Sequence, residues 1–198
     1  MKRPFIISIL IFFLFSCTKD KPEENPNDLT ITNNLIAGGG TSSFQRLIHS
    51  QRTNYLRSVK QTNDGGYIFC GDDDLYSAYK CDILLIRTNA KGETIWIKQF
   101  SDGYLDSGWF VEITSDNGFI LSATSEYVLK SSLQWAQGQL IKTDSNGNQI
   151  WKKSFTFGEI TEFKTVRQTN DGGYIVCGNE FKSHTGILLK VDSSGNEI

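Results

Sequence analysis

Short apolar runs alternate with glycine-containing turns from about residue 44 to the end of the chain. Residues 83–86 and 187–189 are apolar at consecutive positions, whereas a strand with one solvated face alternates apolar and polar residues. These runs therefore predict strands that are covered on both faces. The turn at residues 63–66 contains Asp-Gly and Gly-Gly pairs, which tolerate the positive φ of tight hairpin turns. The pattern predicts antiparallel strands joined by hairpins.

The pattern repeats along the chain. Residues 59–71 recur almost unchanged as residues 166–178, and a looser copy spans residues 111–123. The aspartates of the three turns recur at nearly equal spacing: Asp64, Asp116 and Asp171. A second apolar run and a second glycine turn follow each copy. Four short antiparallel strands that repeat with a period of about 50 residues are typical of β-propeller blades.

The chain is therefore predicted to be all-β, a partial β-propeller of about three four-stranded blades preceded by a signal peptide and a flexible tether. The expected segments are a signal peptide (1–16), a lipidated cysteine with a linker (17–43) and the propeller repeats (44–198). Within the repeats we expect an isolated fourth strand at 44–48, blades at 56–100 and 109–155, and an incomplete blade at 162–198.

Phe44 predicts the isolated fourth strand. Trp96 and Trp151 precede the valine that opens the next repeat by the same number of positions, and Phe44 has this same offset from the valine of the first repeat. Known propellers have at least about four blades, so three units predict an incomplete ring. Three explanations are open: a truncated chain, an open array, and a homodimer in which the 44–48 strand of each chain completes the other chain's unfinished blade.

The N-terminus predicts export and lipid anchoring. Two basic residues follow Met1, and residues 4–16 are an apolar stretch without charge, which fits a signal peptide better than a membrane-spanning helix. The stretch ends before Cys17 in a segment that resembles the lipobox of bacterial lipoproteins, which implies a lipid on Cys17. We expect the chain in the bacterial cell envelope, held to the outer membrane through Cys17, on the periplasmic or the outer surface. An ordinary secretory signal is the alternative.

The repeat motifs resemble a group of bacterial repeat lipoproteins. The resemblance rests on Gln-Thr-x-Asp-Gly-Gly-Tyr-Ile followed by Lys-x-Asp-x-x-Gly-Asn-x-Ile-Trp, and it covers residues 44–198. These proteins are loosely related to propellers of the quinoprotein alcohol dehydrogenase-like type. The motifs are specific for the repeat and not for an activity, so the resemblance implies a fold and no catalytic residues.

The net charge does not indicate a nucleic-acid partner, and the motifs do not indicate a reaction. The 20 basic and 22 acidic side chains leave a formal net charge of −2, which argues against nucleic acid as a partner. No nucleophile, zinc or phosphate-loop motif is present, so we expect neither catalytic residues nor a cofactor. Asp72, Asp73 and Asp74 form a weak calcium candidate in an expected connecting loop, where a solvated acidic loop explains them as well.

Two cysteines are candidates for a disulfide. Cys81 begins the strand that follows Cys70, and an exported protein meets an oxidising compartment. A Cys70–Cys81 bridge is therefore possible.

The longer connections predict the binding surface. Connections between second and third strands, and between units, differ in length and sequence, and function tends to lie on such loops. They carry aromatic residues and one histidine suited to stacking on sugars or contacting a protein, here called the aromatic rim: Tyr76, Tyr79, Tyr104, Tyr127, Trp135, Phe181 and His184. The expected function is a binding or scaffolding module for glycans or proteins. The alternative is a fragment of a propeller enzyme, either a glycoside hydrolase or a quinoprotein-like oxidoreductase.

Overall fold

The computed structural model describes residues 31–32, 44–48, 53–75, 80–102, 105–129 and 132–198. The predicted signal peptide, Cys17 and most of the predicted linker lie outside these residues. Every regular element in the described part is a strand, which confirms the prediction of an all-β chain. No helix among the described residues is long and apolar enough to traverse a bilayer.

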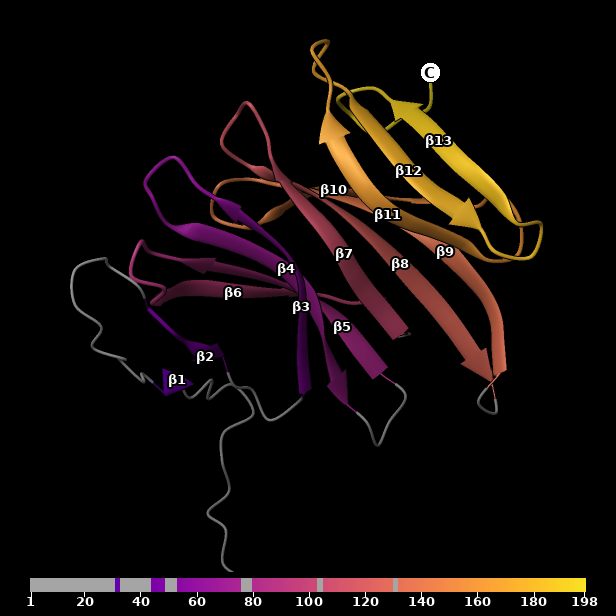
Figure 1. The fold of residues 1–198 in the computed structure, drawn as a ribbon. Helices are drawn as coiled ribbons and strands as arrows, with labels where there is room; N and C mark the ends of the chain where they lie inside the picture. Colours follow the sequence, from indigo (N-terminus) through magenta and orange to yellow (C-terminus); the bar gives the residue numbers. More distant parts are fainter. Residues whose placement is uncertain (1–30, 33–43, 49–52, 76–79, 103–104, 130–131) are drawn as a thin grey trace, which may run out of the picture.

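The strands form three antiparallel units in chain order (Figure 1). Unit one consists of β3 (Thr53–Gln61), β4 (Tyr67–Leu75), β5 (Lys80–Thr88) and β6 (Thr94–Phe100). Unit two consists of β7 (Leu105–Ile113), β8 (Phe119–Leu129), β9 (Ser132–Thr143) and β10 (Gln149–Phe155). Unit three consists of β11 (Thr161–Gln168), β12 (Tyr174–Glu180) and β13 (Thr185–Val191). Before them, β1 (Ile31–Thr32) pairs with β2 (Leu47–Ile48).

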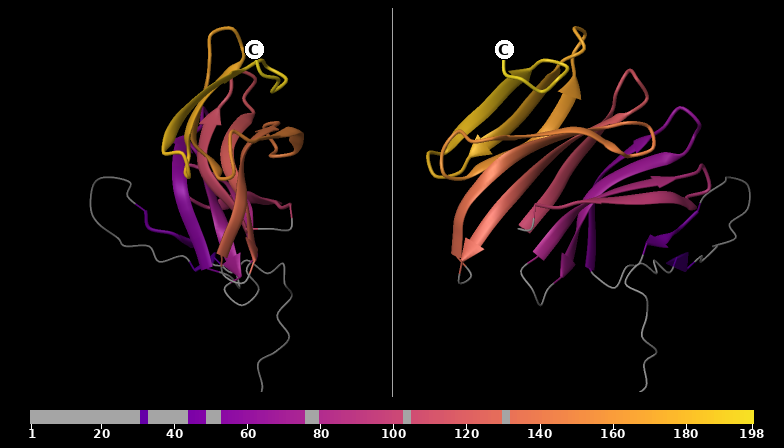
Figure 2. Two further views of the ribbon diagram at one scale, coloured as in Figure 1. Left: turned by 90° about the vertical axis from the view of Figure 1, so that its right-hand side faces the viewer. Right: turned by 180° about the vertical axis from the view of Figure 1, so that it is seen from behind.

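The units are stacked side by side. A single parallel pair, Cys81 with Leu105, links β5 to β7, so units one and two share one hydrogen-bonded network. None of the sheets in the described part closes on itself. Figure 1 shows the turns after β3, β7 and β11 at one end of the stack and the ends of β4, β8 and β12 at the other. The side and rear views of Figure 2 show the same order of units.

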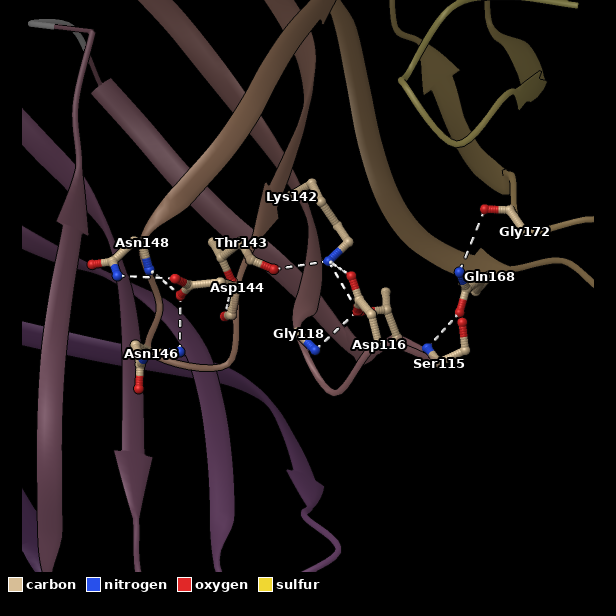
Figure 3. Close-up of polar contacts among 11 residues, drawn as sticks. Ser115, Asp116, Gly118, Lys142, Thr143, Asp144, Asn146, Asn148, Gln168 and Gly172 are labelled. Atoms are coloured by element: carbon tan, nitrogen blue, oxygen red, sulfur yellow. Dashed lines mark hydrogen bonds and ion pairs between the residues drawn. The ribbon is translucent and has the colours of Figure 1, made fainter.

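The first turn of each unit has the same internal construction. In unit two, Asp116 accepts hydrogen bonds from the Thr114 hydroxyl and from the Gly118 N–H, and Lys142 reaches it from β9 with Nζ 2.9 Å from Oδ2 (Figure 3). Unit one repeats the arrangement with Asp64 and Arg87, and unit three with Asp171 and Lys190. Each third strand is thereby tied to the turn between the first two strands.

The second turn of each unit is also closed by its own side chain. Asp144 Oδ1 accepts hydrogen bonds from the backbone N–H groups of Asn146 and Asn148, both at 2.8 Å (Figure 3). Asp192 makes the equivalent bonds in unit three. These aspartates therefore serve hairpin turns.

Two clusters of buried apolar side chains lie between the units. The cluster between units one and two contains Ile68, Cys70, Ile83, Leu85, Phe100, Val111, Phe119, Leu121, Ala123 and Ile141. The cluster between units two and three contains Ile120, Leu140, Phe155, Phe163, Val166, Tyr174, Val176, Leu189 and Val191. Leu140 and Ile141 are neighbours in β9 and point into different clusters, so unit two is covered on both faces.

The prediction of doubly covered strands holds for one of the two apolar runs. All four residues of 83–86 are buried. It is wrong for 187–189, because Leu188 is 76% exposed on the outer face of unit three, over which no described residue packs.

An aromatic contact repeats at each junction. Trp96 of unit one meets Phe119 of unit two edge-on, with ring centroids 6.1 Å apart, and Trp151 meets Tyr174 in the same way at 5.8 Å. Phe44 meets Tyr67 of unit one at 5.9 Å. Phe44 thus has the contact of a fourth-strand tryptophan, although the strand of this segment is limited to Leu47–Ile48.

Two predicted connections are shorter than the sequence suggested. β4 continues through Asp72, Asp73 and Asp74 to Leu75, and β8 continues through Tyr127 to Leu129. The placement of the three aspartates in a loop is therefore wrong: they pair in register with β5.

Candidate functional site

The aromatic rim is only partly visible in the structure. Tyr76, Tyr79 and Tyr104 lie outside the described residues. Tyr127 and Trp135 are opposite one another on β8 and β9, and their rings stack with centroids 5.7 Å apart and planes at 19°.

The other two rim residues lie on unit three. Phe181 and His184 line a hollow of about 330 Å³ beside the ends of β12 and β13. The structure therefore brings the described rim residues together as two pairs on separate units.

A second hollow opens between units one and two, at the same end of the stack. It has a volume of about 230 Å³, and we call it the inner cleft. Its lining comes from β3, β4, β5, β7 and β8: Tyr55, Arg57, Asp72, Cys81, Leu105, Ser107 and Glu126. The cleft thus gathers residues from five strands and two repeat units.

Trp109 lies beside the inner cleft, between two cations. The guanidinium carbon of Arg57 is 4.6 Å from its ring centroid, and the ammonium nitrogen of Lys164 is 3.3 Å from it. The indole N–H donates to Thr124 Oγ1 at 3.0 Å. Arg57, Trp109 and Lys164 each stand two residues before the repeated valine of their unit. They therefore form a cation–aromatic–cation row across the three first strands.

A second row lies on the same strands. Lys60 Nζ is 3.3 Å from Glu112 Oε2, and Arg167 pairs with the same carboxylate oxygen. The ring of Phe110 lies 5.5 Å from Lys60 Nζ and 4.5 Å from the Arg167 guanidinium carbon. Side-chain pairs thus hold the first strands of neighbouring units beside one another.

Asp72 and Asp73 do not converge on one ion. Asp72 is buried, pairs with Arg57 and accepts a hydrogen bond from the Cys81 thiol at 3.4 Å. Asp73 accepts from the Asp82 N–H at 3.1 Å and from the Gln99 amide at 2.8 Å. Successive residues of a strand point to opposite faces, which separates the two carboxylates. In the described part of the chain, no three His, Cys, Asp or Glu side chains gather around a possible metal position.

The Cys70–Cys81 disulfide that the sequence made possible is not formed. Cys70 pairs with Leu85 and Cys81 pairs with Asp74, which places the cysteines four positions apart along the ladder, about 13 Å. A disulfide requires Cα atoms within about 7 Å. Both cysteines are buried as thiols, and burial raises the pKa of Cys70 to about 12.

Glu126 gives the inner cleft a titratable carboxyl group. Burial raises its pKa, and the nearby carboxylate of Glu162 raises it further, while Lys164 and Arg57 oppose the shift. The side chain is half-buried and lines the hollow opposite the Arg57–Asp72 pair. Glu126 therefore can accept or donate a hydrogen bond in the cleft, depending on pH.

The cleft combines hydrogen-bonding groups with aromatic surface. Arg57, Ser107 and Glu126 supply polar atoms, Tyr55 is 45% exposed at the cleft, and Trp109 lies next to it. Such a lining suits a ligand with several hydroxyl groups and an apolar ring face.

The inner cleft was not predicted from the sequence, because its residues lie on regular strands and the predicted site was placed on the variable connections. A usable signal was present in the offset of Arg57, Trp109 and Lys164 from the repeated valine.

No family model matches the chain, and no curated protein matches it significantly.

Proposed function

We propose that this chain is an envelope-anchored lipoprotein whose units are β-propeller blades and which binds a glycan in the inner cleft. The observation that carries the proposal is the meeting of Tyr55, Arg57 and Glu126 in one hollow at the junction of units one and two. The proposed role is binding without catalysis.

The arrangement of the first strands supports the propeller. In a propeller, four-stranded units surround a central channel. Here equivalent residues of β3, β7 and β11 are neighbours, as in the row of Arg57, Trp109 and Lys164. The units pack face to face through two apolar clusters. Both features fit consecutive blades whose first strands face the axis.

The chemistry of the cleft supports a glycan as the ligand. Arg57 and Ser107 can donate to sugar hydroxyls, and ionised Glu126 can accept from them. An aromatic ring such as that of Tyr55 can pack against the apolar face of a sugar.

The state of the carboxyl groups supports binding over glycoside hydrolysis. Hydrolysis of this kind uses two carboxyl groups, one as acid and one as base or nucleophile. Asp72 is engaged by Arg57 and by the Cys81 thiol, which leaves Glu126 to meet a ligand.

Lipid anchoring at Cys17 has its own test. The basic start, the apolar stretch and Cys17 support it. When the wild-type chain is expressed in a Gram-negative host, we expect it to be found in the membrane fraction and to incorporate labelled fatty acid. Cys17→Ala is expected to lose the label and to leave that fraction, and retention of both by Cys17→Ala contradicts anchoring at this residue.

Glycan binding is tested on an array with the full chain and four variants. Tyr55→Ala and Glu126→Gln change the cleft, whereas Tyr127→Ala and Trp135→Ala change the stacked rim pair. We expect the cleft variants to weaken binding by roughly tenfold or more, as for a lost ring contact or a lost hydrogen bond to a charged group. The rim variants should bind like wild type.

Two results contradict the proposal. One is the absence of any bound glycan. The other is glycan binding that survives both cleft substitutions. If only the rim variants lose binding, the site lies at Tyr127 and Trp135. Circular dichroism of each variant establishes that the fold is retained.

A further inference from the structure

The charged side chains that line the inner cleft do not balance. They are Arg57, Asp72 and Glu126, which are one cation and two carboxylates. Arg57 forms an ion pair with Asp72, whose buried carboxylate also accepts a hydrogen bond from the Cys81 thiol. Within the lining, Glu126 is therefore the carboxylate that is left over.

The second cation near the cleft is engaged elsewhere. Lys164 Nζ is 2.8 Å from Glu162 Oε2 and 3.3 Å from the centroid of the Trp109 ring. Across the described part of the chain, no cationic side chain forms an ion pair with Glu126. Arg57 and Lys164 act on it from a distance, and burial and Glu162 outweigh them, so the pKa of Glu126 is raised. A half-buried carboxylate in this state is stabilised by a cation that a ligand brings into the cleft.

Ser107 supplies a second acceptor beside this carboxylate. Glu126 is opposite Leu105 in the ladder of β7 and β8, and Ser107 is two positions further along the same face of β7. Such diagonal positions are about 7–8 Å apart, a gap that one group can bridge by hydrogen bonds to both side chains. An ammonium group carries three N–H donors, so it can donate to the Glu126 carboxylate and to the Ser107 hydroxyl together.

Tyr55 completes the surroundings of such a group. Its ring is 45% exposed and belongs to the same lining. The face of an aromatic ring attracts a cation, and it also packs against the apolar face of a sugar. The cleft therefore offers a carboxylate, a hydroxyl and a ring to a sugar that carries an ammonium group.

We propose that the inner cleft selects glycans that carry a free amino group, whose ammonium form binds the Glu126 carboxylate and the Ser107 hydroxyl. The inference rests on the proposed binding of a glycan at this site, and it names the class of glycan. An N-acetylated sugar keeps its hydroxyl groups but brings no cation, so it leaves the carboxylate half-buried without a partner.

The charged groups around Glu126 give this selectivity a pH dependence. The residues opposite Glu126 in its two ladders, Leu105 and Ala136, carry no charge. The titratable groups that line the hollow with Glu126 or act on it come from β3, β4, β5 and β11: Tyr55, Arg57, Asp72, Cys81, Glu162 and Lys164. Binding of an ammonium group should strengthen as Glu126 ionises with rising pH, until the amine of the ligand loses its own proton.

The selectivity is tested with the full chain on an array of matched glycan pairs, identical except for a free or an N-acetylated amino group. We expect the free-amine member of a pair to bind roughly tenfold or more tightly, as for a hydrogen bond between charged groups. Equal binding of the two members, or binding confined to glycans without a free amine, overturns the inference and leaves the proposed glycan binding standing. The absence of any bound glycan removes both.

Two variants locate the selectivity. Glu126→Gln is expected to bind both members of a pair alike, because the amide keeps hydrogen bonds and loses the charge. Glu112→Gln is the matched control: it removes the same charge from β7, where Glu112 pairs with Lys60 and Arg167 and lies outside the cleft lining. The control should keep the wild-type preference. With folds verified by circular dichroism, a preference that persists in Glu126→Gln, or that is lost in Glu112→Gln, overturns the assignment to Glu126.

Titration calorimetry against pH gives an independent measurement with the free-amine glycan that binds most tightly on the array. The affinity of the wild-type chain should rise as the pH increases from about 4 towards neutrality, because Glu126 ionises in this range. The affinity of Glu126→Gln should stay low and lack this rise. Parallel pH profiles for the two proteins would show that another group binds the amine.

Discussion

The indole of Trp96 lies directly against Gly147: a Cβ atom placed on this glycine would come within 2.7 Å of Trp96 Cη2. Gly147 has a φ of 75°, in the left-handed region that favours glycine. Trp151 lies against Gly195 in the same way, at 3.0 Å from a Cβ atom placed on that glycine. The glycine of the second turn is thus required by its own backbone and by the aromatic ring of the preceding unit.

Gly147→Ala is expected to lower the free energy of unfolding by about 3 kcal/mol, because it adds a left-handed alanine and displaces the ring of Trp96. Gly172→Ala is the control, since Gly172 has a φ of 81° and nothing within 4 Å of the added Cβ. It should lower stability by only about 1 kcal/mol. Urea unfolding of both variants measures the difference, and equal losses would contradict a role for the Trp96 contact.

Asp116 makes stability depend on acid pH. Burial raises its pKa, but the Thr114 hydroxyl, Lys142 and the Gly118 N–H together lower it from 3.8 to about 2. A carboxyl with a lowered pKa stabilises the fold above pH 3.8, and this contribution is lost as the pH falls towards 2. Asp116→Asn is expected to lower the unfolding free energy at pH 7 by about 1 kcal/mol, discounted for the exposure of the side chain. The difference from wild type should shrink between pH 4 and pH 2, and a constant difference in thermal melts would refute the assignment.

Ionisation of Glu126 has the opposite effect on stability to ionisation of Asp116. Its raised pKa means that the folded chain holds the proton more tightly than the unfolded chain, so ionisation as the pH rises weakens the fold. Glu126→Gln is therefore expected to stabilise the chain at pH 7, by about 1 kcal/mol or less because solvent screens a half-buried group. The gain should vanish towards pH 4. Destabilisation by this substitution at pH 7 would show that the ionised carboxylate is favourably paired.

Cys70 and Cys81 are expected to remain thiols under oxidising conditions. Peptide mass spectrometry without reduction should detect no Cys70–Cys81 linkage, because the ladder keeps the residues too far apart. Alkylation of the native chain should be slow at Cys70, whose pKa of about 12 leaves almost no thiolate at neutral pH. Denaturation should make both residues reactive. A linked peptide from the native protein would show that the register of β4 and β5 is wrong.

The local features of the fold were predictable from the sequence because they depend on local chemistry. The turn at Asp64 needs only the neighbouring threonine and glycines, and these recur at Asp116 and Asp171. The spacing of Phe44 predicted its equivalence to the tryptophans. The aspartates 72–74 were misplaced because aspartate is rare in strands, and Arg57 supplies the charge that allows Asp72 to be buried in one.

The candidate site depends on relations that local pattern does not contain. Arg57, Trp109 and Lys164 differ in type, and they become neighbours only when equivalent strands of three units lie beside each other. The aromatic rim was inferred from loop length, and β8 and β9 proved longer than expected, so Tyr127 and Trp135 lie on strands.

Unit two lies between two neighbouring units, and this position affects the order in which parts of the molecule unfold. In a linear stack, the stability of each member is its own plus that of the contacts on either side. Within the described part of the chain, unit two packs against a unit on each side, whereas units one and three each pack against one other unit. Thermal fluctuations should therefore detach the outermost strands first, and amide protons at the centre of β8 should be the last to exchange with solvent deuterium.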